Sequence, residues 1–212
     1  AEETVLVDAG VSPQLAEKRN LPGYVNPAKI LEGIDVKAEE VKHVILTHLH
    51  WDHVDGLNLF PNATVYSQNA ECDFWLGGET AHRPPFTFFL NNESREACNF
   101  VVESGRMRGV EGDQTILPGI ECLLAPGHSV ALQAVAVNIA GGVAVLGSDC
   151  AHLFRNYKEN RPSALIIDMV AWVQSIKKLK SRVSAPELLF PGHDPLMSFN
   201  YPEVAPGITR LA

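Results

Sequence analysis

Four side chains that can bind a metal ion stand within positions 48–53. Residues 47–56 have the sequence Thr-His-Leu-His-Trp-Asp-His-Val-Asp-Gly, and the candidate ligands are His48, His50, Asp52 and His53. On an extended segment His48 and His50 project to the same side, whereas the adjacent Asp52 and His53 diverge. A strand that ends in a tight turn, with a helix beginning at Asp52, resolves this conflict because it presents one pair to each of two neighbouring ions.

Three further candidate ligands lie later in the chain and argue against a chance cluster of polar residues. His128 stands in Ala-Pro-Gly-His-Ser, and His193 stands in Phe-Pro-Gly-His-Asp. Each follows an apolar run and a Pro-Gly turn, so we expect both in loops at strand ends, where ligands and catalytic groups concentrate. Asp149 ends a third apolar run, Val-Ala-Val-Leu-Gly-Ser-Asp. Imidazoles and carboxylates without a thiolate suit Zn²⁺ and tolerate Fe²⁺, Mn²⁺ or Co²⁺.

The order of these motifs resembles that of the metallo-β-lactamase-fold hydrolases, from Leu6 to the C-terminus. In that family an HxHxDH motif is followed by His, then Asp, then His. The resemblance implies two divalent metal ions, with Zn²⁺ as the leading candidate. It divides the ligands into a first site with His48, His50 and His128, a second site with Asp52, His53 and His193, and a bridge, Asp149.

The resemblance also predicts the fold class, an α/β (α+β) protein with the four-layer αββα metallo-β-lactamase sandwich. We expect a single domain over residues 1–212. The family usually has one or two strands before the segment that matches Leu6, so we expect the chain to lack its first N-terminal strands, and any signal peptide with them. Asp8 ends a segment similar to an early strand of the family and would orient a ligand histidine. A simple turn or cap role is the alternative for Asp8.

Local patterns predict the elements that carry these residues. We expect helices at 13–19 and at 27–33, the second capped by Asn26. A later helix has the apolar stripe Met169, Trp172, Val173, Ile176 and Leu179, with a solvated basic face opposite it. Strands are predicted at 41–47, 64–67, 121–125, 134–139 and 142–147, with a hairpin turn between the last two.

Composition is consistent with a soluble enzyme. The chain has 212 residues, is 46% hydrophobic and has a formal charge of −8, with no extended basic patch, which argues against a nucleic-acid substrate. No apolar run approaches 18 residues, so we predict no membrane span. The compartment is not determined, although the cytoplasm is favoured, and a homodimer is left open. The four cysteines form no CxxC pair, and we expect buried thiols. We do not expect Cys150, beside Asp149, to bind a metal, because the ligand set is already full.

The interval between His53 and His128 contains an aromatic, proline-rich stretch at 82–90. Its prolines argue against a regular central strand. Two interpretations are equally compatible with the pattern: the aromatic residues line an apolar substrate pocket, or they pack a long loop onto the body of the protein.

The spacing from Asp149 to His193 and the run at 126–133 are similar to those of the N-acyl homoserine lactone lactonases. Those enzymes commonly carry a tyrosine three positions beyond the bridging aspartate, where it can donate a hydrogen bond to the carbonyl oxygen. Here that position is His152. An imidazole can also donate to an oxyanion, so we predict His152 as a catalytic residue, with a surface histidine as the alternative. The departure leaves the particular lactone open.

The resulting prediction is a dinuclear metal-dependent hydrolase that opens a lactone ring by attack of a metal-bridging hydroxide. Its substrate would be an N-acyl homoserine lactone or a related cyclic ester, and Asp52 would transfer the proton to the leaving group. A glyoxalase-II-like thioesterase or another hydrolase of the same fold, such as a β-lactamase, is the alternative. A non-catalytic metal-binding scaffold is disfavoured, because a structural zinc site needs only about four ligands around one ion.

Overall fold

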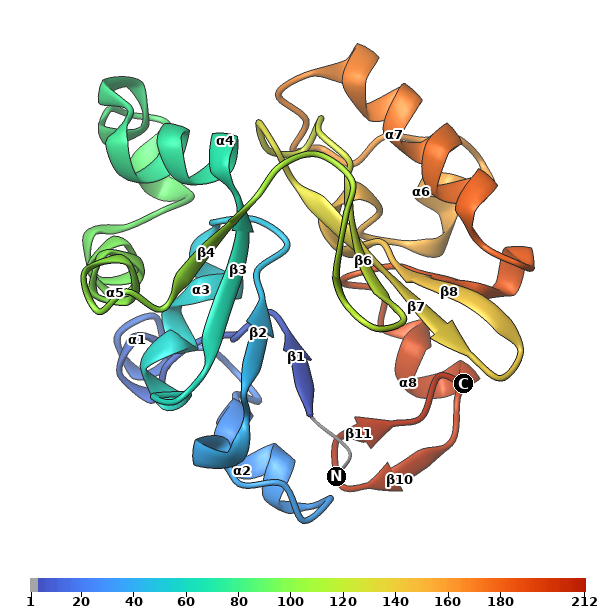
Figure 1. The fold of residues 1–212 in the computed structure, drawn as a ribbon, viewed down its shortest axis with the longest axis horizontal. Coiled ribbons are helices and arrows are strands. Elements are labelled where there is room, and N and C mark those ends of the chain that lie inside the picture. The colour runs from blue at the N-terminus through green and yellow to red at the C-terminus, as the bar shows by residue number, and fades with distance from the viewer. Residues whose placement is uncertain (1–3) are drawn as a thin grey trace. The chain divides into compact units, whose positions relative to one another are not determined.

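The structure is a computed structural model that describes residues 4–212 and divides the chain into two compact units (Figure 1). The first unit comprises residues 1–67, 72–109 and 203–209, and the second comprises residues 68–71, 110–202 and 210–212. The HxHxDH segment therefore belongs to the first unit, and His128, Asp149 and His193 belong to the second. The expectation of a single domain stays a prediction.

A four-stranded sheet forms the centre of the first unit. Its order is β1-β2-β3-β4, with the bounds Val5–Val7, His43–Ile45, Thr64–Gln68 and Met107–Val110. Strands β1, β2 and β3 are mutually parallel. Parallel strands are buried on both faces and therefore consist of continuous apolar residues, as the fully buried Val44 and Ile45 of β2 illustrate.

Helices lie beside this sheet, and α3 and α5 pack together on one side of it (Figure 1). The helices are α1, α2, α3 and α5, with the bounds Pro13–Lys18, Pro27–Glu32, Trp51–Val54 and Asn92–Glu103. A further short helix, α4 (Asn69–Cys72), follows β3. The Asn26 cap of α2 is confirmed, because its side chain accepts a hydrogen bond from the Ala28 amide at 2.9 Å. Helix α3 begins at Trp51, one residue before the predicted Asp52, with His50 as its N-cap.

A five-stranded sheet forms the centre of the second unit. Its order is β5-β6-β7-β8-β9, with the bounds Gln114–Leu117, Ile120–Leu124, Gln133–Ile139, Gly142–Leu146 and Leu189–Phe190. Strand β6 is antiparallel to β7 and β7 to β8, whereas β8 and β9 are parallel. It follows that β6, β8 and β9 all run in the same direction, so their carboxyl ends lie at the same edge of the sheet. His128, Asp149 and His193 follow these three strands.

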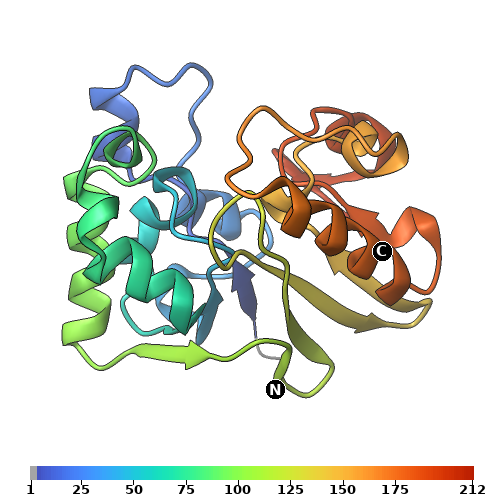
Figure 2. The ribbon, with the colours of Figure 1, turned by 90° about the horizontal axis from the view of Figure 1, so that it is seen from above.

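Helices cover one face of this second sheet (Figure 1, Figure 2). They are α6 (Phe154–Lys158) and α7 (Met169–Arg182), and a short helix α8 (Leu196–Asn200) follows β9. The predicted stripe of α7 is correct for Trp172, Ile176 and Leu179, which are buried against the sheet. It is wrong for Met169 and Val173, which are 48% and 55% exposed.

Ser175 takes the remaining core-facing position of α7, because its hydroxyl donates a hydrogen bond to the Pro126 carbonyl at 2.8 Å and is therefore satisfied when buried. The basic face of the same helix is not wholly solvated. Lys178 pairs with Asp113 and also donates to the Leu124 carbonyl at 2.8 Å, and Arg182 pairs with Glu121.

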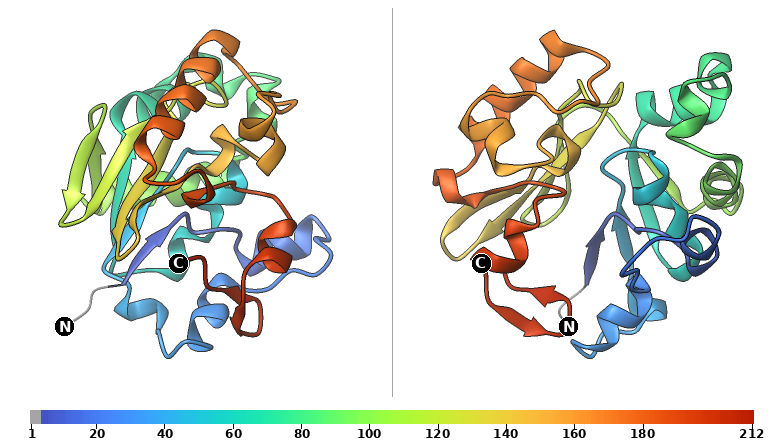
Figure 3. Two further views of the ribbon diagram at one scale, coloured as in Figure 1. Left: turned by 90° about the vertical axis from the view of Figure 1, so that its right-hand side faces the viewer. Right: turned by 180° about the vertical axis from the view of Figure 1, so that it is seen from behind.

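The last two strands, β10 (Glu203–Ala205) and β11 (Ile208–Thr209), form an antiparallel pair that belongs to the first unit (Figure 3). Ala205 and Ile208 lie close to Gly33 at the end of α2. Among residues 4–212, no helix is both long enough and apolar enough to cross a membrane.

Candidate metal centre

The HxHxDH segment follows β2 and brings its three histidines together. The ring centroid of His48 lies 4.3 Å from that of His50 and 4.1 Å from that of His53. His48 is fully buried, and His50 and His53 are each 6% exposed. The Asp52 carboxylate lies 3.7 Å from Nε2 of His53 and is 30% exposed. The strand, turn and helix predicted for this segment are confirmed, and they direct all four side chains to one small region of the first unit.

Asp8 controls the protonation pattern of two of these histidines. Its Oδ2 lies 2.7 Å from Nδ1 of His53, and it accepts a hydrogen bond from the Thr47 hydroxyl at 2.9 Å. The Thr47 oxygen is in turn 3.1 Å from Nδ1 of His48. Because the carboxylate only accepts and the hydroxyl proton is already used, both histidines carry their proton on Nδ1. Their Nε2 lone pairs therefore remain available to a metal ion.

The parallel pairing of β1 with β2 explains why Asp8 reaches these residues. The carboxyl ends of paired parallel strands are adjacent, so the residue after Val7 lies beside the residues after Ile45. The Asp8 amide donates to the Ile45 carbonyl at 2.8 Å, and the Asp8 carboxylate accepts from the Thr47 amide at 2.7 Å. Asp8 adopts a left-handed backbone with φ of 61°, which Asp tolerates better than most residues. We interpret Asp8 as the residue that orients His48 and His53.

The aromatic stretch at 82–90 packs onto the body of the first unit, as the second of the two interpretations predicts, and its role in a substrate pocket stays a prediction. Phe89 stacks on the ring of His50 at a centroid distance of 4.9 Å, and its carbonyl accepts from the Trp51 amide at 2.7 Å. Trp75 makes an edge contact with the same histidine at 5.1 Å. Phe86 instead packs against Trp75 and the core. One residue of the stretch, Phe89, therefore contacts a candidate ligand, and another, Phe86, packs against the hydrophobic core.

In the second unit, three histidines converge on the carboxylate of Asp149. His193 places Nε2 3.0 Å from Oδ1, and His152 and His128 place Nε2 3.1 Å and 3.5 Å from Oδ2. Asp149 and His128 are 3% and 2% exposed, whereas the His193 side chain is 42% exposed. Ligand atoms of His128, Asp149 and His152 lie close enough together to hold one ion. The structure thus brings the two predicted histidine ligands of this half of the sequence, His128 and His193, to the carboxylate of the third, Asp149.

A glycine allows the His193 loop to approach Asp149. A Cβ atom on Gly192 would lie 2.8 Å from Oδ1 of Asp149 and 2.9 Å from the Ser148 carbonyl carbon. The loop is also tied to the start of α6, because the His193 amide donates to the His152 carbonyl at 2.9 Å. Asp194 accepts from the Phe154 amide at 2.8 Å. In the Pro-Gly-His-Asp sequence, Gly192 therefore permits a close approach to Asp149, and Asp194 caps the start of α6.

His128 is held by segments that the sequence did not connect with it. Its Nδ1 lies 2.7 Å from the Leu165 carbonyl, an acceptor, so Nδ1 carries the proton and Nε2 offers its lone pair. The Gly127 carbonyl accepts from the Ile167 amide at 2.8 Å. A Cβ on Gly127 would lie 2.6 Å from the Cα of Trp172, so only glycine permits this contact with α7.

Glu71 is a buried carboxylate that sequence analysis missed. It is fully buried in α4, accepts from the Ser129 hydroxyl and accepts from the Ala131 amide at 2.8 Å. Both donors lie in the loop that begins with His128. A lone glutamate in an unassigned segment carries no local signal of such a role, because its partners are about 60 positions away.

His152 differs from His48, His53 and His128 in its hydrogen bonds. Its Nδ1 is buried and has no hydrogen-bond partner among residues 4–212, whereas its Nε2 faces the Asp149 carboxylate. A proton on Nε2 is the arrangement that this acceptor favours. No partner at Nδ1 fixes the proton there, so Nε2 of His152 can carry the proton and act as a hydrogen-bond donor.

The cysteines are buried thiols, as predicted. Cys98, Cys122 and Cys150 are buried and Cys72 is partly buried, all in the free form. Burial raises the pKa of the Cys150 thiol to about 12, with the neighbouring Asp149 charge as a further cause. Because a thiol must lose its proton to bind a metal, this environment disfavours Cys150 as a ligand.

Comparison with known proteins agrees with this geometry. Residues 1–69 match the family model of the metallo-beta-lactamase superfamily. The chain is 27% identical over 209 residues to an N-acyl homoserine lactonase of Bacillus cereus, an alignment that covers 91% of this chain and 77% of that protein. A quorum-quenching N-acyl homoserine lactone lactonase of known structure superimposes with a TM-score of 0.75 at 25% identity, covering 96% of this chain and 80% of its own. The chain has the metallo-β-lactamase fold.

A further solved structure shares this fold at lower sequence identity. AidC, a dizinc quorum-quenching lactonase in complex with the product N-hexanoyl-L-homoserine, superimposes with a TM-score of 0.71 at 19% identity, covering 92% of this chain and 69% of its own. The predicted α/β metallo-β-lactamase fold is confirmed, and so is the predicted similarity to the N-acyl homoserine lactone lactonases. Several imidazoles direct Nε2 toward one carboxylate, that of Asp149. Such a set of donor atoms fits a divalent metal ion.

Proposed function

We propose that this chain is a metal-dependent hydrolase that opens N-acyl homoserine lactones or closely related lactones. The observation that carries the proposal is the convergence of three imidazoles on the Asp149 carboxylate, with the Nδ1 proton of His128 fixed by a carbonyl. Similarity to N-acyl homoserine lactonases over 91% of the chain supports the substrate class.

We assign the ligands by the family pattern. His48, His50 and His128 would hold one ion, Asp52, His53 and His193 would hold the other, and Asp149 would be a ligand of both. Nitrogen and carboxylate donors in this number suit Zn²⁺, which we propose as the native metal. Two such ions would supply a water of lowered pKa and polarise the lactone carbonyl.

The remaining steps depend on protein side chains. Asp52 is 30% exposed, so its carboxylate can accept a proton and pass it to the alkoxide that leaves when the ester bond breaks. His152 would donate a hydrogen bond from Nε2 to the lactone oxygen that becomes negative, which lowers the energy of the tetrahedral state. In the absence of substrate, Asp149 accepts this hydrogen bond.

Metal content and turnover test the proposal together. We expect His128→Ala to lose metal, measured by mass spectrometry, and to lose nearly all turnover of homoserine lactone in a pH-stat. His152→Ala should retain its metal and lose rate. His82→Ala, at an exposed position in the first unit, is the matched control and should retain both.

The opposite results have separate meanings. Full lactone turnover by metal-poor His128→Ala protein would contradict the proposed chemistry. Metal-loaded protein that hydrolyses thioesters but not lactones would assign the chain to a glyoxalase-II-like activity. A fully metallated protein that hydrolyses lactones, thioesters and lactams at no detectable rate would indicate a non-catalytic scaffold.

A further inference from the structure

A pocket of about 520 Å³ adjoins the metal-ligand cluster within the second unit. His152 and His193 both line it, and both contact Asp149. The rest is formed by the start of α6 and by the segment 161–165, whose Leu165 carbonyl also holds His128. A substrate whose reacting carbonyl lies at Asp149 can therefore extend its substituent into this pocket.

The walls of the pocket are mainly apolar, and its charged groups are arginines. Leu153, Pro162 and Leu165 contribute apolar surface. Arg155 and Arg161 line the same pocket and are 54% and 65% exposed. Aliphatic walls suit a chain of methylene groups, and guanidinium groups suit a carboxylate, which they can bind through two parallel hydrogen bonds.

A single acidic residue partly neutralises the two arginines. Nη2 of Arg155 lies 3.2 Å and Nε of Arg161 lies 2.9 Å from the same oxygen, Oε2 of Glu159. One carboxylate shared by two guanidinium groups leaves a net charge of about +1 and most of their N–H donors unused. This local positive charge opposes the net charge of −8 of the chain, which would otherwise repel anionic substrates.

We propose that this pocket selects lactones whose acyl substituent carries an anionic group, with Arg155 and Arg161 as the residues that determine this specificity. The inference rests on the proposed lactonase function and specifies its substrate class. The apolar walls contact the methylene portion of the substituent, and the two arginines bind its carboxylate.

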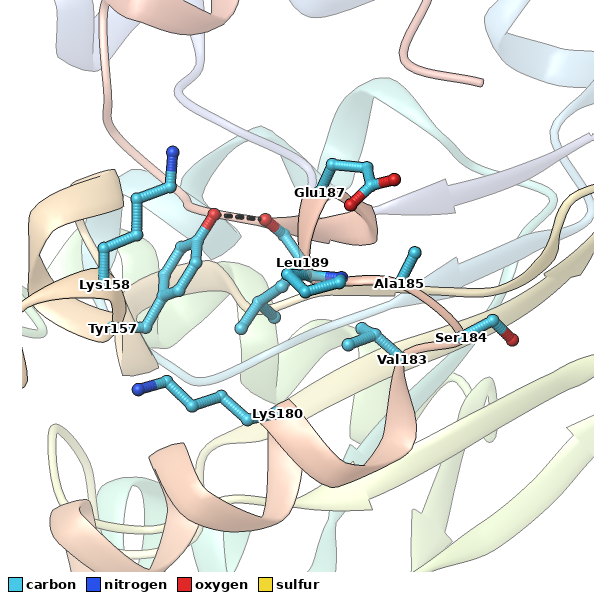
Figure 4. Close-up of a pocket in the computed structure, with 9 residues that line it drawn as sticks. Tyr157, Lys158, Lys180, Val183, Ser184, Ala185, Glu187 and Leu189 are labelled. Carbon is cyan, nitrogen blue, oxygen red and sulfur yellow. Dashed lines mark hydrogen bonds between the residues drawn. The ribbon is translucent and has the colours of Figure 1, made fainter.

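A second cationic pocket provides an internal control. It has a volume of about 560 Å³ and is lined by Lys158 and Lys180, with Tyr157 and Leu189 between them (Figure 4). The Tyr157 hydroxyl donates to the Leu189 carbonyl at 2.7 Å, as the dashed line in Figure 4 marks. This pocket contains no histidine of the Asp149 cluster. Its lysines therefore reproduce the charge but not the position of the arginines.

The experiment compares two homoserine lactones of equal acyl length, one with a terminal methyl group and one with a terminal carboxylate. The metal-loaded wild-type protein should show the higher kcat/KM with the carboxylated lactone. Because an exposed ion pair is worth up to about fivefold in binding, Arg155→Glu combined with Arg161→Glu should lower that kcat/KM by at least about fivefold. The same variant should hydrolyse the methyl-terminated lactone within about twofold of the wild-type rate.

Two further measurements sharpen the test. Glu159→Gln frees both guanidinium groups and should raise kcat/KM for the carboxylated lactone alone. High salt should reduce the preference, because ions screen exposed charges over about 10 Å at 0.1 M and about 3 Å at 1 M. The control, Lys158→Glu combined with Lys180→Glu, changes the net charge equally and should leave the ratio of the two kcat/KM values unchanged.

The outcomes separate the two proposals. If both lactones are opened and the arginine and lysine variants behave alike, the specificity inference is overturned while the lactonase function stands. If metal-loaded protein opens neither lactone, the lactonase function fails and the specificity inference falls with it. A selective loss in the arginine variant supports both.

Discussion

At the scale of single residues, the Asp8 carboxylate sets the position of the proton on two candidate metal ligands, His48 and His53. Asp8 accepts from Nδ1 of His53 directly and sets the proton on His48 through the Thr47 hydroxyl. His128 obtains the same tautomer from a carbonyl, and His152 has no such partner among the described residues. This difference divides the histidines into candidate ligands and a candidate hydrogen-bond donor.

Asp8→Asn tests this arrangement with a side chain of nearly the same shape as Asp. An amide cannot accept from both Thr47 and His53 as a carboxylate does, so the imidazole loses its orientation and basicity. We expect metal affinity to fall by about 10–100-fold, the usual effect of removing such a partner. Competition with a chelator measures it. Asp35→Asn, at an exposed site with a similar left-handed backbone, is the control and should bind metal normally; equal affinity in the two variants would contradict the role of Asp8.

Glu71→Gln tests the support of the His128 loop. The amide retains one acceptor and places a donor against Ser129 or the Ala131 amide, so one buried hydrogen bond is lost. We expect the free energy of unfolding to fall by about 1–3 kcal/mol, measured with urea, and metal affinity to fall as well. Glu103→Gln on the exposed face of α5 should change stability by less than about 0.5 kcal/mol. Unaltered metal affinity in Glu71→Gln would limit Glu71 to a purely structural role.

At the scale of elements, strand direction brings the ligands together. Because β6, β8 and β9 run the same way, the loops that follow them meet at one sheet edge. The segment 161–167 after α6 has two functions. It lines the pocket that contains Arg155 and Arg161, and it holds the His128 loop through Leu165 and Ile167.

Gly127→Ala probes the contact between this loop and α7. A Cβ here would lie 2.6–2.7 Å from the backbone of Trp172 at a φ of 136°, so the helix or the loop must move. We expect a loss of at least about 3 kcal/mol in the free energy of unfolding. Gly112→Ala has a positive φ of 63° but open space around it, and should cost only about 1–2 kcal/mol. Similar losses for the two variants, measured by denaturant unfolding, would argue against tight packing at Gly127.

At the scale of the whole molecule, buried thiols link stability to alkaline pH. Burial raises the pKa of Cys122 and of Cys150 from 9.0 to about 12, and raises that of Cys98 further. Below pH 9 all three are protonated in both states, so their contribution to stability is fully present. Between about pH 9 and 12 the unfolded chain loses protons first, and stability falls as pH rises.

We therefore predict a decline in the free energy of unfolding above pH 9, by roughly 1.4 kcal/mol per pH unit for each such thiol. Cys150→Ala should make the slope against pH shallower, whatever its effect on absolute stability. Val101→Ala also creates a core cavity but removes no titrating group, so it should keep the wild-type slope. Urea unfolding from pH 8 to pH 11 measures the slopes, and identical slopes in both variants would refute the assignment.

The sequence by itself determined the types of the candidate ligands, their local spacing and the elements that carry them. The His48–His53 cluster, the loop positions of His128 and His193, and the cap at Asn26 all depend on interactions within a few positions, which a local pattern encodes. Local spacing also gave two wrong predictions of burial, both in α7. Met169 and Val173 fit an apolar stripe by spacing but are exposed, because burial depends on where the sheet lies beside the helix.

Only the tertiary structure decided which distant residues support the ligands and line the adjoining pocket. Asp8 reaches His53 across 45 positions through the parallel pairing of β1 and β2, and Glu71 reaches Ala131 across 60. Arg155 and Arg161 are recognised as a pair only in the structure, where both contact Glu159 and both line one pocket. Such contacts depend on strand direction, register and the packing of loops, which are set by the burial of the whole core and leave no periodic trace in the sequence.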